Sequence, residues 1–195
     1  MNSLFLDKNI ILASKSPRRQ ELLKMASVPF KVLTVEDVDE SYPQDMDCDD
    51  VALFLARKKM QAYSDIFEKG GNTIVITADT TVVCCDKILG KPAGYDDAYY
   101  MLKTLSGGDH DVITAVVIKS SSKESAFKVK TRVTFKELPD NIIRYYLDNF
   151  SPYDKAGAYG IQEWIGVIGV SSVSGSYYNV VGLPVSRIYD ELLKF

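Results

Sequence analysis

The signals of a membrane, exported or nucleic-acid-binding protein are absent from this sequence of 195 residues. No apolar run approaches the roughly 20 residues that a helix needs to cross a bilayer. Residues 1–7 lack the basic segment and the long apolar stretch of a signal peptide. The formal net charge of −3 gives no support for a general affinity toward nucleic acids or membrane surfaces, so neither is expected as a partner.

Histidine and cysteine are scarce. His110 is the one histidine, and no Gly-x-Ser-x-Gly segment accompanies it, so we expect a structural role for it rather than nucleophilic catalysis. Cys48, Cys84 and Cys85 have no spacing that suits a zinc site. Neighbouring residues on a strand point to opposite faces, which makes the adjacent pair poor disulfide partners. We therefore expect buried free thiols in a reducing compartment, with the cytoplasm as the location.

The composition is that of an ordinary globular protein. Hydrophobic residues make up 46% and charged residues 25% of the chain, and the length fits one domain over residues 1–195. The apolar patterns predict strands at 10–13, 30–35, 73–85, 112–118, 127–135, 164–173 and 177–181. They predict helices opening at Ser16-Pro17 and at 51–68, 96–105, 139–150 and 185–195. This irregular mixture predicts an α/β or α+β domain around one mixed sheet, not a purely doubly wound fold.

Two arginines stand where cations are unfavourable. Arg18 and Arg19 fall in the first turn of the expected helix, where backbone N–H groups are unpaired and the helix dipole is positive. A phosphate would reverse this cost, because it accepts from those N–H groups and pairs with both guanidinium groups. Ser14 and Ser16 could add hydroxyl donors. The alternative is a solvated surface pair.

A lysine interrupts the apolar pattern of the expected helix 51–68. Lys59 lies in the middle of a stripe formed by Val51, Leu55, Ala62 and Ile66, so it either snorkels to solvent or faces a buried anion site.

Asp79 interrupts the segment 73–85, which is otherwise nearly free of charge. A buried carboxylate must be paired, hydrogen-bonded or bound to a metal. Its position suits a strand end that opens into a cleft, and the alternative is a turn residue where the strand breaks early. Glu40 could ligate a hard cation together with Asp79, or could be solvated.

Two loops have the composition of ligand-binding segments. Gly90-Lys91-Pro92 combines a glycine that permits close approach of the backbone with a stiffening proline, although by itself it is a weak signal. The small residues of 156–161 indicate a tight loop that presents the amide of Gln162, which can read a base edge because it both donates and accepts hydrogen bonds.

Short blocks along nearly the whole chain match one known pattern in order. They are residues 12–23, 38–40, 56–59, 78–80, 88–92, 105–107 with His110, 154–162 and 175–184. On these blocks the chain resembles the Maf family of nucleoside triphosphate pyrophosphatases. The resemblance implies an elongated, twisted mixed sheet flanked by helices, with two lobes and a central cleft as in the inosine triphosphatase group, in an assembly that is often dimeric.

The resemblance also assigns roles. It implies hydrolysis of a nucleoside triphosphate to the monophosphate and pyrophosphate with a divalent metal, Mg²⁺ or Mn²⁺. The catalytic carboxylate matches Asp79, and Glu40 lies near the metal. The phosphate-binding positions match Ser14, Arg19, Lys59 and Lys91.

The family's base-specificity positions match Arg18, Thr80 and Gln162, the residues of the branch that takes dTTP and UTP. Gln162-Glu163-Trp164 departs from the usual pattern of the family, and Trp164 could narrow the cleft beside Gln162. Two alternatives stay open: the same chemistry on purine or noncanonical nucleotides, and a nucleotide-binding regulator of cell division without important catalysis.

Overall fold

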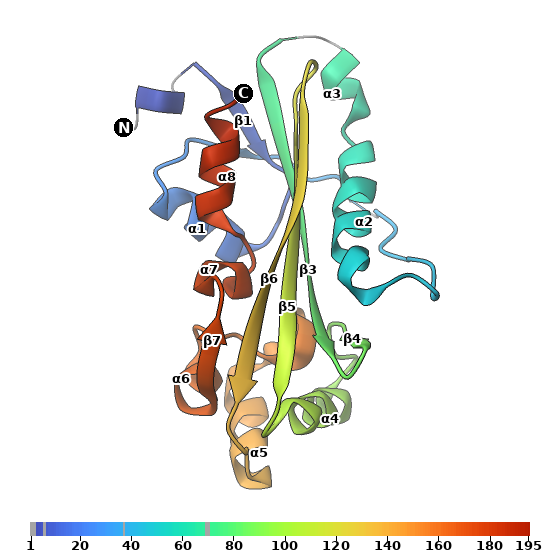
Figure 1. Cartoon of the computed structure of the whole chain (residues 1–195), viewed down its shortest axis with the longest axis vertical. Helices are drawn as coiled ribbons and strands as arrows, with labels where there is room; N and C mark the ends of the chain where they lie inside the picture. The colour runs from blue at the N-terminus through green and yellow to red at the C-terminus, as the bar shows by residue number, and fades with distance from the viewer. Residues whose placement is uncertain (1–2, 6, 37, 69–70) are drawn as a thin grey trace. The chain divides into compact units, whose positions relative to one another are not determined.

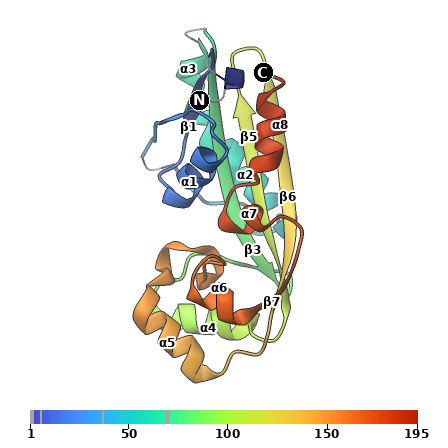
Figure 2. The ribbon, with the colours of Figure 1, turned by 90° about the vertical axis from the view of Figure 1, so that its left-hand side faces the viewer.

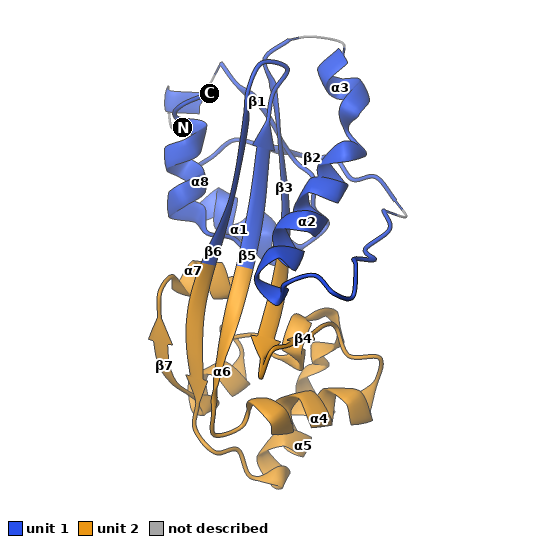
Figure 3. Ribbon diagram, turned by 45° about the vertical axis from the view of Figure 1, so that its right-hand side comes forward, with its two compact units in different colours: residues 1–79, 114–129, 182–195 blue, residues 80–113, 130–181 orange. Residues whose placement is uncertain are grey.

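The computed structural model describes residues 3–5, 7–36, 38–68 and 71–195, which form two compact units (Figure 3). Unit 1 comprises Met1–Asp79, Thr114–Val129 and Gly182–Phe195, and unit 2 comprises Thr80–Ile113 and Lys130–Val181. The boundary after Asp79 falls inside a strand.

One mixed sheet supplies the strands of both units, as predicted. Seven strands in the described part of the chain follow the order β2-β1-β3-β5-β6-β7, with β4 paired to β3. β1 pairs in parallel with β2 and β3, whereas β4 is antiparallel to β3 and β7 is antiparallel to β6. The bounds are β1 Asn9–Leu12, β2 Lys31–Val32, β3 Thr73–Cys84, β4 Lys87–Leu89, β5 Asp109–Lys119, β6 Glu124–Phe135 and β7 Val170–Ser174.

Helices cover both faces of the strands in unit 1. α1 and α8 lie on one side and α2 lies on the other (Figures 1 and 2). α1 begins as predicted, because the Ser16 hydroxyl accepts a hydrogen bond from the backbone N–H of Arg19 and Pro17 occupies the first position. The elements are η1 Ser3–Phe5, α1 Pro17–Met25, α2 Cys48–Gln61, α3 Ser64–Glu68 and α8 Val185–Leu192.

Unit 2 has its own apolar core. Leu102 of α4, Ile143 and Tyr146 of α5 and Ile165 of α6 are fully buried in one cluster. Among the described residues, no helix has the length and apolarity that a membrane crossing requires. The elements are α4 Tyr95–Leu105, α5 Asp140–Phe150, η2 Pro152–Asp154, η3 Ala156–Ala158, α6 Trp164–Gly169 and α7 Tyr177–Val181.

Two strands predicted near the C-terminus differ from the structure. The segment 164–173 is a strand only from Val170, because α6 occupies its first six residues, and β7 then continues to Ser174. The predicted strand 177–181 is wrong, because this segment is α7. Tertiary contacts override the strand propensity of these residues. Trp164 stacks on Phe150 of α5, with ring centroids 5.8 Å apart, and the Asn179 amide of α7 donates to the carbonyl of Val112 at 3.0 Å.

Two other predicted elements are shorter than expected. The segment 30–35 keeps only Lys31–Val32 as a strand, because the Tyr63 hydroxyl donates to the carbonyl of Leu33 and accepts from the N–H of Val35. The predicted helix 51–68 divides into α2 and α3, since the N–H groups of Ala62 and Tyr63 turn back to the carbonyls three residues earlier.

The cysteines are free, as expected, but they differ in exposure. Cys84 is buried, Cys48 is half-buried and Cys85 is exposed, because Cys85 lies in the turn between β3 and β4 with φ of 51°. The expectation of buried thiols is therefore confirmed for Cys84, met only in part for Cys48 and wrong for Cys85.

His110 lies in the core of unit 2. Its ring stacks on Phe135, with centroids 5.5 Å apart, and its Nε2 lies 2.7 Å from the hydroxyl of Tyr159. Burial lowers the pKa of His110 to about 4, so the imidazole is neutral at physiological pH. These contacts fit the structural role expected for it.

Candidate active site

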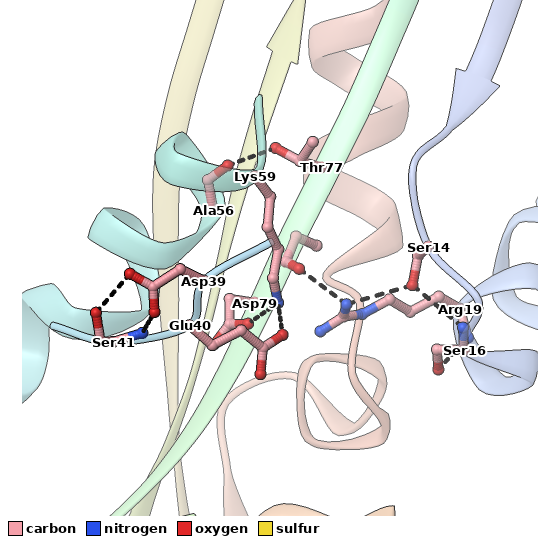
Figure 4. Close-up of polar contacts among 11 residues, drawn as sticks. Ser14, Ser16, Arg19, Asp39, Glu40, Ser41, Ala56, Lys59, Thr77 and Asp79 are labelled. Carbon is pink, nitrogen blue, oxygen red and sulfur yellow. Dashed lines mark hydrogen bonds and ion pairs between the residues drawn. The ribbon is translucent and has the colours of Figure 1, made fainter. Parts of the chain in front are cut away.

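A lysine between two carboxylates forms the centre of the polar cluster in unit 1 (Figure 4). The Lys59 ammonium lies 2.5 Å from Oδ1 of Asp79 and 2.8 Å from Oε1 of Glu40. The side chain of Lys59 is 19% exposed and that of Asp79 is 12% exposed, whereas Glu40 is 53% exposed. Lys59 therefore does not extend alone into solvent but pairs with one buried and one exposed carboxylate.

The helix and strand periods place Lys59 of α2 opposite Asp79 of β3. Ala56 and Lys59 are three residues apart on α2 and share a helix face, while Thr77 and Asp79 are two apart on β3 and share a sheet face. The hydroxyl of Thr77 donates to the carbonyl of Ala56 at 2.8 Å, which fixes α2 against β3 one step before the ion pair. The expectation that Asp79 ends its strand is wrong, because β3 continues to Cys84.

Arg19 joins the same cluster from α1. Its Nε donates to the carbonyl of Gly182 at 2.9 Å. Its Nη1 donates to the carbonyl of Ala78 at 2.8 Å and to Oγ of Ser14 at 3.5 Å, and Figure 4 shows the contact with Ser14. Burial lowers the pKa of Arg19 and the charge of Asp79 raises it, but a guanidinium keeps its proton at neutral pH. A fixed positive charge thus stands beside the strand residue that precedes Asp79.

Ser14 and Arg18 complete the predicted residues of unit 1. Ser14 is buried, and its hydroxyl accepts from the N–H of Ser16 at 3.2 Å. Arg18 is half-buried in the first turn of α1, a turn with no acidic residue. The charge of Arg18 contributes to the lowered pKa of Arg19, so two cations are close together at a helix N-terminus. The structure thus brings Ser14, Arg19, Glu40, Lys59 and Asp79 together, with Arg18 next to Arg19.

The remaining predicted residues belong to unit 2. Thr80 follows Asp79 on β3 and is half-buried, Lys91 is exposed in the loop after β4, and Gln162 is exposed in the turn before α6. The N–H of Gly157 donates to the carbonyl of Gly90 at 3.0 Å, so the loops of Lys91 and Gln162 are hydrogen-bonded to each other near their starts.

Gly157 makes this junction possible. Its φ is +69°, and an added Cβ would lie 3.1 Å from Cγ1 of Val82 on β3. Because that conformation and that contact both favour a residue without a side chain, the glycine lets the loop rest on the strand.

A second charged cluster in unit 2 escaped the sequence analysis. The ammonium of Lys155 lies 2.7 Å from Oδ1 of Asp154 and 2.9 Å from Oε1 of Glu163, and the hydroxyl of Tyr146 donates to Oε2 of Glu163 at 2.6 Å. The signal that could have found it is Lys155 itself, a charge next to the small apolar residues that follow it.

The chemistry of Glu40 and Asp79 suits a hard divalent cation. Both carboxylates already bind one positive group, the Lys59 ammonium, so their oxygens face a common point. No group of three or more His, Cys, Asp or Glu side chains positioned for a metal is found among the described residues. Mg²⁺ is often held by one or two carboxylates together with substrate phosphates, and the donor set present here fits that pattern.

Comparisons with known proteins agree with this picture. The family model described as Maf-like protein matches residues 9–195. A dTTP/UTP pyrophosphatase of Parabacteroides distasonis is 48% identical over 186 residues, covering 95% of each chain. A dTTP/UTP pyrophosphatase of Bacteroides thetaiotaomicron is 48% identical over 190 residues, covering 97% of each chain.

A solved structure shares the fold. The Staphylococcus aureus Ham1 protein aligns with a TM-score of 0.53 and 14% identity, covering 94% of this chain and 100% of that one. On the family match and the extent of the sequence identity, this chain belongs to the Maf family.

Proposed function

We propose that this protein hydrolyses dTTP, UTP or modified pyrimidine nucleotides to the nucleoside monophosphate and pyrophosphate, and so removes unwanted nucleotides from the pool. Curated relatives that are 48% identical over 95% of both chains are named dTTP/UTP pyrophosphatases. The observation that carries the proposal is the Lys59 ammonium held by Asp79 and Glu40, with the Arg19 guanidinium bonded to the adjacent carbonyl of Ala78.

Several positive side chains would bind the triphosphate. Such a group carries roughly four negative charges, so a site needs cations of similar number. Arg18, Arg19 and Lys59 would supply three, and Lys91 is the fourth cation that the family resemblance implies. Ser14 adds a hydroxyl, and the N-terminus of α1 adds a favourable dipole.

Asp79 is the proposed catalytic residue. Its carboxylate would orient a water molecule and accept a proton as the water oxygen forms a bond to phosphorus. The phosphorus–oxygen bond of the anhydride breaks, and pyrophosphate leaves with the bonding electrons. Arg19 and Lys59 would stabilise the negative charge that spreads over the phosphoryl oxygens, which is the main catalytic contribution in reactions of this class.

Glu40 and Asp79 would hold the divalent metal, Mg²⁺ or Mn²⁺. When bound, such an ion neutralises phosphate charge and lowers the barrier to attack on phosphorus. The Lys59 ammonium has three donors, so it would also donate to a phosphate oxygen.

Base selection is assigned to Gln162, with Thr80 and Arg18. A uracil or thymine ring offers one N–H donor between two carbonyl acceptors, and the amide of Gln162 can both accept from and donate to that edge. Cytosine lacks the N–H at this position, so the same amide would discriminate against it.

We further propose that residues 1–195 act as one domain in the cytoplasm, that the protein forms a homodimer, and that no nucleic acid or membrane is a partner. The net charge of −3 agrees with the absence of nucleic-acid and membrane partners, and cysteines without a disulfide agree with a reducing compartment. The homodimer rests on the resemblance to the Maf family.

A substrate panel tests the proposal. The purified protein is incubated with each common ribonucleoside and deoxyribonucleoside triphosphate and with modified pyrimidine nucleotides, in Mg²⁺, in Mn²⁺ and in a chelator, and pyrophosphate is measured. We expect pyrophosphate from dTTP and UTP only when a metal is present. Faster hydrolysis of purine nucleotides would replace the pyrimidine assignment, and nucleotide binding without turnover would favour the regulatory alternative.

A further inference from the structure

Glu163, the residue after Gln162, belongs to a charged network with Lys155 and Tyr146. We propose that Glu163, Lys155 and Tyr146 are positioning residues that set the orientation of Gln162 for pyrimidine recognition. The inference rests on the proposed function, because it takes Gln162 as the residue that reads the base.

Glu163 is held at each of its polar groups. Its backbone N–H donates to the carbonyl of Gly160 at 3.0 Å, which closes the turn 160–163 around Gln162. Its Oε1 lies 2.9 Å from the Lys155 ammonium, and its Oε2 accepts from the Tyr146 hydroxyl at 2.6 Å. The residue that follows Gln162 is therefore fixed through both its main chain and its side chain.

The side chains of the network are largely buried. Tyr146 has no exposed surface, and the side chains of Lys155 and Glu163 are 10% and 25% exposed. Burial and the neighbouring Glu163 carboxylate raise the pKa of Tyr146, so its hydroxyl stays protonated and keeps donating. Gln162 itself is exposed. Its amide is therefore accessible to a ligand, whereas the next residue, Glu163, is held by buried side chains.

The backbone on both sides of Gln162 is closely packed. A Cβ added to Gly160 would lie 2.8 Å from Cδ of Glu163, and that carboxylate has no freedom to move aside while it binds Lys155 and Tyr146. A Cβ added to Gly166 of α6 would lie 1.9 Å from the carbonyl oxygen of Ile161. A buried ion pair gains little net stability over apolar packing, because its desolvation offsets most of the attraction. A role in orientation explains its presence better than a role in stability.

The central test uses Glu163→Gln, which keeps the shape of the side chain and removes its charge. We expect KM for UTP and dTTP to rise about fivefold, because a displaced amide loses its hydrogen bonds to the base, while kcat changes less than twofold. We expect KM and kcat for CTP to stay unchanged, so that the preference for UTP over CTP falls by the same factor of about five. Lys155→Met should reproduce this result, and Lys155→Arg should restore the preference because it keeps the positive charge.

Two matched variants separate positioning from general damage. Asp140→Asn removes an exposed carboxylate at the start of α5, the helix of Tyr146, where it lies 2.7 Å from the Lys103 ammonium, and should leave the UTP/CTP preference unchanged. Gln162→Ala should lower that preference at least as much as Glu163→Gln. If Glu163→Gln folds poorly, Tyr146→Phe removes one hydrogen bond to the same carboxylate and should lower the preference less.

Several outcomes overturn the inference. One is an unchanged UTP/CTP preference in Glu163→Gln, and another is an equal loss of activity on every nucleotide together with a lower melting temperature. If the wild-type protein hydrolyses no nucleotide, the proposed function fails, and binding of UMP and CMP is then measured through the fluorescence of Trp164, the one tryptophan of the sequence. Weaker binding of UMP but not of CMP by Glu163→Gln would still support the positioning role, and equal binding by the variant and the wild type would end it.

Discussion

The two units contain the same charged arrangement in different settings. In unit 1, Lys59 lies between Asp79 and Glu40 at 2.5 and 2.8 Å, and in unit 2, Lys155 lies between Asp154 and Glu163 at 2.7 and 2.9 Å. Lys59 joins two segments that are distant in the sequence, whereas Lys155 pairs with its own neighbour and with a residue one loop away. Glu163 also accepts a hydrogen bond from the buried Tyr146. One lysine–carboxylate cluster thus joins the elements of the proposed chemistry, and the other joins residues within and beside the loop of Gln162.

The largest effect is expected at the carboxylate of the first cluster. Asp79→Asn keeps the size of the side chain but removes the group that would accept a proton from water. We expect kcat to fall by about 10²–10⁴-fold with the melting temperature nearly unchanged. Pyrophosphate release by the purified variant at close to the wild-type rate would exclude Asp79 as the base.

Acid should lower the stability of the folded protein through protonation of His110 in unit 2. In the unfolded chain His110 takes up a proton near pH 6.5, but in the folded protein burial lowers its pKa to about 4. Between these values the unfolded state binds more protons, so stability falls as the pH drops from 6.5 to 4, by about 3 kcal/mol in total.

Denaturant unfolding at pH 7 and pH 4 measures this loss. The variant His110→Phe keeps a ring against Phe135 and should lose less stability than the wild type over the same interval. Equal losses in the two proteins would show that carboxylates alone account for acid sensitivity.

A smaller effect is expected at the lysine of unit 1. Lys59→Ala removes a charge-assisted hydrogen bond to phosphate, so KM for the triphosphate should rise about 10–100-fold while the melting temperature changes little. The neighbouring variant Lys58→Ala removes an ammonium that lies 2.7 Å from Oδ2 of Asp39 and serves as the control. A large drop in melting temperature with an unchanged KM would assign Lys59 a structural role instead.

The smallest effect is expected at Gln162, in the turn before α6 of unit 2. Gln162→Ala removes hydrogen bonds between neutral groups, so the ratio of kcat/KM for UTP over CTP should fall by up to about tenfold. Steady-state assays with the two nucleotides measure the ratio directly. A ratio equal to that of the wild type would exclude Gln162 from base recognition. It would not bear on the proposed roles of Arg19, Lys59 and Asp79 in unit 1.

Local patterns predicted most of the fold and the charged residues of unit 1. Lys59 and Asp79 stood out because each interrupts an apolar pattern, and the structure pairs them. The capping residue and first turn of α1 were likewise readable, because Ser16-Pro17 acts through its immediate neighbours. Features that depend on a few adjacent residues are visible in a sequence.

The features that were missed depend on contacts between distant residues. The short helices α6 and α7 have strand-forming compositions, and only their packing on Phe150 and Val112 shows their true conformation. Tyr146, Lys155 and Glu163 are each unremarkable alone, because a tyrosine on an amphipathic helix and two opposite charges in a loop are common. These three side chains come into contact only when α5 packs against the loop that contains Lys155 and Glu163.

The contact between Gly157 and Val82 also bears on how this protein can evolve. An alanine at 157 would face a left-handed backbone angle of +69° and three Val82 side-chain atoms within 3.3 Å. Shortening Val82 would relieve the crowding but not the backbone strain, so no single compensating change restores the site. Descendants of this chain should therefore keep glycine at 157 while residues nearby drift, and a lineage that has lost it should have rebuilt the whole loop.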